Sequence, residues 1–100
     1  MMFRQGDVLI RDPVSLPEGA KRLTGDIVQE GEVTGHAHRI VNGEVWECEG
    51  RRFVVTNEDA SLKHEEHKKL ELPPVKPGKA FPIDIQREYD DEEEWRQVAD

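Results

Sequence analysis

The sequence contains a single cysteine, Cys48, so it cannot form an internal disulfide bond. It also has no run close to the about 20 apolar residues that a membrane helix needs. Residues 1–7 lack the basic-then-apolar layout of a signal peptide. These absences argue against secretion and against a membrane partner, and we expect a cytoplasmic protein.

Apolar residues are scarce at 35%, whereas charged residues make up 36%. A chain of 100 residues allows one domain with a modest core, because it buries only about 60–70% of its unfolded surface. We expect residues 1–89 to form a single β domain, followed by an acidic helix or tail over residues 90–100. The formal net charge of −8 disfavours direct binding to nucleic acid, since it repels phosphate groups.

Short apolar runs separated by turn signals predict a mainly β fold, a small antiparallel barrel or sandwich. Asn42-Gly43 is the strongest hairpin signal, because both residues accept the positive φ of a two-residue turn. It predicts that His36–Val41 pairs with Glu44–Glu49. With Arg52–Thr56 as the third strand, these segments form a central three-stranded meander.

Alternation along the second of these strands places Trp46 and Cys48 on the inner face and Val45 on the outer face. Trp46 is therefore expected in the core. Further turns are predicted at Glu49-Gly50 and at Asn57–Ala60, where polar residues and glycine interrupt the apolar pattern.

The C-terminal half after the meander is less regular in its pattern. Residues 61–72 are compatible with a helix, a turn or a strand, and the proline-rich residues 73–78 predict a loop. Residues 81–89 predict a last strand. The acidic run Asp90–Glu94, followed by Trp95, is typical of the start of a short C-terminal helix.

All four histidines fall in two tight pairs, Gly-His-Ala-His at residues 35–38 and His-Glu-Glu-His at residues 64–67. His36 and His38 are two apart, so on a strand they point to the same side. His64 and His67 are three apart, which makes them neighbours on a helix or tight turn but not on a regular strand. The functional hypothesis depends on whether the two pairs meet.

If they meet, His36 and His38 bind a divalent metal ion together with one or both of His64 and His67. Zinc is the default assignment, although imidazole also suits nickel, copper and iron. Glu65 or Glu66 is a candidate carboxylate ligand, or a base toward a metal-bound water. The sequence selects no reaction and no catalytic residue.

Two other motifs are excluded by their spacing. The His-Glu-Glu-His segment is one residue short of the zinc-protease motif, which does not support a metalloprotease. The glycines around residues 31–35 do not match a phosphate-binding loop, and we predict no residues that bind an organic cofactor.

Four segments resemble the ordered blocks of an uncharacterised family of small bacterial and phage proteins. They are Arg4–Ile10 (RQGDVLI), Glu30–Ile40 (EGEVTGHAHRI), His64–His67 (HEEH) and Gln86–Tyr89 (QREY). The resemblance implies a distinct fold unit, a role for both histidine blocks, and the cytoplasm of a bacterium or of a phage host. It implies no activity. Val75-Lys76-Pro77 precedes Gly78, which departs from the family's leucine-proline-proline-glycine turn.

Two further hypotheses need no metal. The histidines could be surface or hydrogen-bonded structural residues in a non-enzymatic, acidic interaction module that binds a basic host protein, in part through Asp90–Glu94. Alternatively, the protein is a β subunit of an assembly and forms a homo-oligomer.

Overall fold

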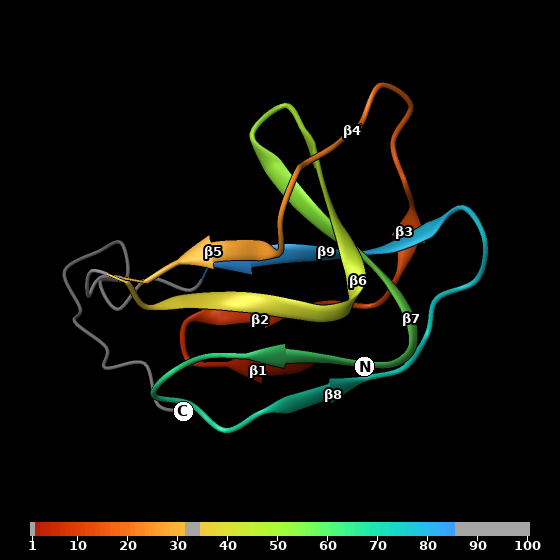
Figure 1. Cartoon of the computed structure of the whole chain (residues 1–100). Coiled ribbons are helices and arrows are strands. Elements are labelled where there is room, and N and C mark those ends of the chain that lie inside the picture. Colours follow the sequence, from red (N-terminus) through yellow and green to blue (C-terminus); the bar gives the residue numbers. More distant parts are fainter. Residues whose placement is uncertain (1, 32–34, 86–100) are drawn as a thin grey trace, which may run out of the picture.

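Nine β-strands make up the described part of the computed structural model, which covers residues 2–31 and 35–85 (Figure 1). The described residues contain no helix. The strands are β1 (Phe3–Gln5), β2 (Val8–Ile10), β3 (Val14–Ser15), β4 (Lys21–Arg22), β5 (Ile27–Glu30), β6 (Ala37–Cys48), β7 (Arg51–Lys63), β8 (Leu70–Leu72) and β9 (Lys79–Ile85).

The strands form one antiparallel sheet in the order β1-β2-β9-β7-β6-β4. Three more strands pair off this path, β3 with β9, β5 with β6, and β8 with β7. The prediction of a mainly β, antiparallel fold is confirmed. Among the described strands the sheet is not closed into a barrel.

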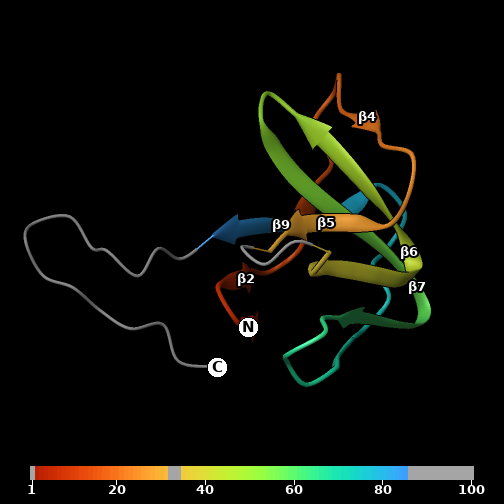
Figure 2. The ribbon, with the colours of Figure 1, turned by 60° about the vertical axis from the view of Figure 1, so that its left-hand side comes forward.

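The two longest strands of this sheet, β6 and β7, form a hairpin. Its turn lies at Glu49-Gly50, where both residues have positive φ, 52° and 82°. The predicted turn at this position is confirmed. The tip of the hairpin rises above the other strands and carries β4 beside it (Figures 1 and 2).

The hairpin predicted at Asn42-Gly43 is wrong. Asn42 does have positive φ, 61°, but β6 continues through it without reversing. The pairing with β7 shifts there, from Val41 opposite Ser61 to Gly43 opposite Thr56. Positive φ serves equally in a tight turn and in a β-bulge, and here it makes a bulge. The predicted central meander is therefore one two-stranded hairpin rather than three successive strands.

The turn predicted at Asn57–Ala60 is also wrong, because these residues belong to β7. They lie where the extra residues of β7 face the bulge, and Asp59 has a φ of 60°. The side-chain amide of Asn42 donates a hydrogen bond to the carbonyl of Asp59 at 3.1 Å. The polar residues thus stabilise an irregularity in two paired strands.

The bulge reverses which residues of β6 face the core. The positive φ of Asn42 interrupts the alternation of faces along β6, so Ile40 and Val45 share the buried face although they are five apart. Val45 is 1% exposed, whereas Trp46 is partly exposed and donates from Nε1 to Glu44 at 3.0 Å. The expectation that Trp46 is a core residue is wrong for this reason.

The core is built from the apolar faces of β2, β5, β6, β7, β8 and β9. Aliphatic side chains dominate it, since β-branched and leucine side chains pack well on a pleated surface. Its members are Val8, Ile10, Val28, Ile40, Val45, Val54, Leu62, Leu72, Phe81 and Ile83.

Residues 61–72, which the sequence left open, end β7 at Lys63, form a turn over residues 64–69 and return as β8. The loop predicted over residues 73–78 is confirmed. The last strand is described up to Ile85. Its predicted continuation to Tyr89, the acidic run Asp90–Glu94 and the predicted C-terminal helix lie outside the described residues.

Candidate functional site

Three segments meet at one end of the sheet, at the left in Figure 1. They are the turn between β1 and β2, the start of β6, and the turn between β7 and β8. The two histidine pairs lie in the second and third of these segments. The first pair and the second pair are thereby brought together, although 26 residues separate His38 from His64 in the sequence.

The four imidazole rings form one cluster. The ring centres of His38 and His64 are 4.4 Å apart, and those of His64 and His67 are 4.5 Å apart. The ring of His38 is nearly parallel to that of His67 at 5.9 Å, and the ring of His36 lies 6.0 Å from that of His64. His64 is thus the centre of the histidine cluster.

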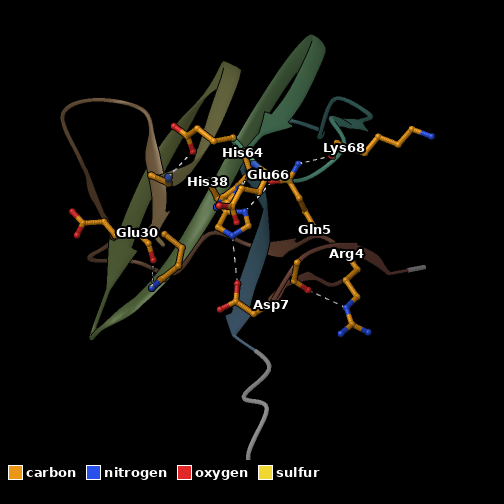
Figure 3. A network of polar contacts seen from close by, with 12 residues as sticks. Arg4, Gln5, Asp7, Glu30, His38, His64, Glu66 and Lys68 are labelled. Carbon is orange, nitrogen blue, oxygen red and sulfur yellow. Dashed lines mark hydrogen bonds and ion pairs between the residues drawn. The ribbon is translucent and has the colours of Figure 1, made fainter. Parts of the chain in front are cut away.

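His38 is the buried member of the cluster, with 1% of its surface exposed. Its Nδ1 lies 2.8 Å from Oε1 of Gln5, which is also buried (Figure 3). The Gln5 amide nitrogen donates to the carbonyls of Leu62 at 2.7 Å and Lys68 at 2.9 Å. Only the NH₂ group can donate to two carbonyls, so the oxygen of Gln5 must face His38 and accept.

This network assigns the tautomer of His38. Because Gln5 Oε1 accepts, Nδ1 of His38 carries the hydrogen. Burial and, second, repulsion from a protonated His64 lower the pKa of His38 to about 4, against the opposing attraction of Asp7. The ring is therefore neutral at pH 7, and its Nε2 holds an unprotonated lone pair.

Nε2 of His38 faces the carboxylate of Asp7, whose Oδ1 lies 3.4 Å away (Figure 3). Asp7 sits in the turn between β1 and β2, and its side chain is 44% exposed. The contact places a carboxylate from a third segment at the edge of the histidine cluster.

The turn over residues 64–67 is held by its own polar groups. Nδ1 of His64 accepts a hydrogen bond from the backbone N–H of Glu66 at 3.0 Å. Burial and, next, the neighbouring His67 lower the pKa of His64. Burial and the neighbouring imidazoles therefore favour the neutral forms of His38 and His64.

The two glutamates predicted as ligand or base both reach the start of β6. Oε1 of Glu65 accepts a hydrogen bond from the backbone N–H of Ala37 at 3.0 Å, which lowers the pKa of this carboxyl. Oε2 of Glu66 lies 3.2 Å from Nδ1 of His36. That nitrogen is buried and the approach of Glu66 lacks hydrogen-bond geometry, so it is a close contact without a formed hydrogen bond.

Gly6 allows the second histidine pair to approach the turn between β1 and β2. It has a φ of +60°, and a Cβ placed on it would lie 2.6 Å from Nε2 of His67. The ring of His67 therefore packs directly on the backbone at Gly6. Any larger residue would displace this ring.

Sequence reasoning missed Gln5, Gly6 and Asp7. All three lie in the segment Arg4–Ile10, which carried part of the family resemblance but suggested no role. A buried glutamine in a short strand leaves no periodic signal, because its partners are carbonyls from β7 and the turn after it. Only the pairing of distant segments reveals its role.

Within residues 2–31 and 35–85, no three His, Cys, Asp or Glu side chains are arranged to hold a metal ion as they stand. Cys48 lies at the far end of β6, beside the hairpin turn, and is partly exposed.

A family model described as a domain of unknown function, DUF8820, matches residues 4–76 of this chain. The chain belongs to this family. The match spans the segment from Arg4 through both histidine pairs, so every residue of the cluster described above lies inside it. No curated protein and no solved structure matches the chain. In the part of the chain that the structure describes, no helix is long and apolar enough to span a membrane.

Proposed function

We propose that this member of the DUF8820 family binds a divalent transition-metal ion, zinc by default, at the histidine cluster. The observation that carries the proposal is the convergence of all four histidines from two distant segments. When imidazole nitrogens lie about 2.0–2.1 Å from a tetrahedral ion, the centres of two coordinating rings are about 5 Å apart. The observed separations of 4.4–6.0 Å lie on both sides of this value.

The environment of His38 supports the same proposal. Histidines that ligate metals almost always donate their other ring N–H to an oxygen, which orients the ring and raises its basicity. Gln5 supplies such an oxygen at 2.8 Å and is itself held by two backbone carbonyls. Nε2 of His38 is thereby oriented as a neutral donor.

Metal binding requires the turn after β7 to rearrange. Nδ1 of His64 accepts the N–H of Glu66, so the neutral ring carries its proton on Nε2. If Nδ1 binds the ion, its lone pair can no longer accept this hydrogen bond. If Nε2 binds the ion, the ring proton moves to Nδ1, which then cannot accept it either. Either way the bond from Glu66 is lost, at a cost of about 1 kcal/mol, which is small beside the about 10–16 kcal/mol of a structural zinc site.

The donor set suits several ions. Imidazole nitrogen binds zinc, copper, nickel and iron, and selectivity among them depends on geometry and availability. Bound metal would join the start of β6 to the turn between β7 and β8. A structural contribution to stability therefore accompanies any chemistry at the ion.

The first test is elemental analysis of protein purified without a histidine tag, followed by zinc titration of chelator-treated protein in a calorimeter. We expect one ion per chain and a higher melting temperature with zinc than without it, because binding to the folded state stabilises it. The double variant His64→Ala/His67→Ala should lose binding. Its matched control, Lys63→Ala/Lys69→Ala, changes exposed residues at the two ends of the same segment and should bind like the wild type.

A wild type that takes up no zinc, nickel, copper or iron, and whose melting temperature is equal with and without chelator, would reject the proposal. That result would leave the non-metal hypothesis from the sequence, an acidic module that binds a basic protein.

A further inference from the structure

The pair formed by His38 and Asp7 requires a cation between its two atoms. Gln5 accepts a hydrogen bond from Nδ1 of His38, so Nε2 is the ring nitrogen left to meet a partner. Nε2 faces Oδ1 of Asp7, and both atoms can donate an electron pair. Two such atoms repel each other unless a proton or a metal ion lies between them.

The distance fits a shared metal ion better than a strong hydrogen bond. N–H···O hydrogen bonds between protein groups span about 2.7–3.2 Å, and those between ionised groups lie at the short end of that range. Two donor atoms that each lie about 2.0–2.1 Å from a tetrahedral ion are about 3.3–3.4 Å apart. Nε2 of His38 and Oδ1 of Asp7 are 3.4 Å apart, the separation of two ligands on one tetrahedral ion.

We propose that Asp7 is a direct ligand of the metal ion, paired with Nε2 of His38, and that the site is a mixed imidazole and carboxylate site. This inference rests on the proposed metal binding and adds a ligand that the histidine pattern does not contain. The ion links three segments, since Asp7 belongs to the turn between β1 and β2, His38 to β6, and the loop histidines to the turn after β7.

The two glutamates beside the second histidine pair are poorer candidates for this ligand. Glu65 already accepts the N–H of Ala37 at 3.0 Å, and Glu66 lies against His36 at 3.2 Å with a side chain that is 56% exposed. Asp7 is the carboxylate that lies against Nε2 of the buried His38.

The position of Asp7 also makes the ion accessible. His38 is buried below it, whereas the Asp7 side chain is 44% exposed. An ion between a buried imidazole and a half-exposed carboxylate faces solvent on one side. Water or a small anion, such as a carboxylate or phosphate, is the class of ligand that reaches it there.

The test is zinc titration by calorimetry of chelator-treated wild type, Asp7→Asn and Asp26→Asn. Asp26 is the matched control, because its side chain is similarly exposed at 52% and pairs with Arg39 at 3.3 Å away from the cluster. We expect Asp7→Asn to weaken zinc binding by more than the about 10–100-fold that loss of an outer-sphere partner causes. Asp26→Asn should bind like the wild type.

A second variant gives a positive signal that a merely structural role of Asp7 cannot produce. In Asp7→Cys loaded with Co²⁺, a thiolate on the ion should give a near-ultraviolet charge-transfer band. Wild type and Asp26→Cys loaded in the same way should lack it. The band is expected even if the affinity changes little.

The outcomes separate the two proposals. Wild-type affinity in Asp7→Asn, or no charge-transfer band in cobalt-loaded Asp7→Cys, would overturn the role of Asp7 while zinc binding by the wild type still supports the histidine site. If the wild type itself binds neither zinc nor cobalt, both proposals fail.

Discussion

Oε1 of Gln5 accepts a hydrogen bond from Nδ1 of His38 at 2.8 Å, and both side chains are buried. Gln5 belongs to β1 and His38 to β6, and these strands are not neighbours in the sheet. The glutamine joins them because its amide also bonds to the end of β7 and to the turn that follows. The side chain of Gln5 therefore links the buried His38 to the end of β7 and to the turn that follows it.

Replacement of Gln5 by leucine should destabilise the protein. The variant leaves Nδ1 of His38 and two carbonyls without their partner, and one unsatisfied buried group costs about 1–3 kcal/mol. Urea denaturation measures the loss. Gln29→Leu is the control, since the amide of Gln29 makes an exposed contact of 3.5 Å with the carbonyl of Glu30. In the same variant, ¹⁵N NMR should show that His38 no longer populates the Nδ1–H tautomer alone, and retention of that tautomer would contradict the role of Gln5.

Acid should destabilise the metal-free protein through His38. In the folded protein the pKa of His38 is about 4, below the usual histidine value of about 6.5. Between these values the unfolded chain binds a proton that the folded ring does not, so falling pH favours unfolding. The contribution is fully retained above pH 6.5 and is lost as pH falls toward 4, by about 3 kcal/mol in all. The lowered pKa of His64 acts in the same direction.

The measurement is urea denaturation at several pH values with chelator present, together with NMR titration of the imidazoles. His38→Gln should show a shallower dependence on pH than the wild type over this window. A His38 ring that titrates near 6.5 in the folded wild type would contradict its burial against Gln5.

Gly6→Ala should disturb the site as well as the turn. Positive φ costs a residue with a Cβ about 1–2 kcal/mol, and the new methyl group would lie 2.6 Å from His67. Gly50→Ala is a matched control, because Gly50 has a φ of +82° but open space around its Cβ position. Both variants should lose stability in urea, but only Gly6→Ala should weaken zinc binding. Equal zinc affinity in the two would show that the position of His67 is unimportant.

The bulge at Asn42 makes Val45 more important to stability than its larger neighbour. Val45→Ala removes two buried carbons and should cost about 2 kcal/mol, from about 0.8 kcal/mol per carbon plus the cavity left behind. Trp46→Ala should cost less than the about 3–5 kcal/mol of a buried tryptophan, because Trp46 is partly exposed. Thermal and urea denaturation of both variants would show the order. A greater loss in Trp46→Ala would restore the original assignment of faces.

Several features could be predicted from the residues alone. Apolar runs separated by glycine, proline and asparagine indicated antiparallel strands, and Glu49-Gly50 indicated the turn of the main hairpin. Positive φ at Asn42 was also predictable. Its use in a bulge was not, because turn and bulge need the same local conformation and only pairing with β7 decides between them.

For the histidine cluster, too, the sequence was enough to predict one part of the arrangement and not the other. Spacing within each pair was enough to predict that His64 and His67 are neighbours only if the chain turns there, and that His36 and His38 face one side. Whether the pairs meet depends on which strands become neighbours, and the spacing within a pair carries no such information. The antiparallel pairing of β6 with β7, in which Arg39 lies opposite Lys63, brings them together.

By itself, the sequence determined the class of the fold, the donor chemistry and the two histidine pairs, because these depend on composition and on short-range spacing. The tertiary structure alone decided that Gln5 fixes the tautomer of His38, that Gly6 admits the ring of His67, and that Asp7 faces the remaining lone pair. These relationships join residues from separate strands, and their physical cause is the close packing of three distant segments at one end of the sheet.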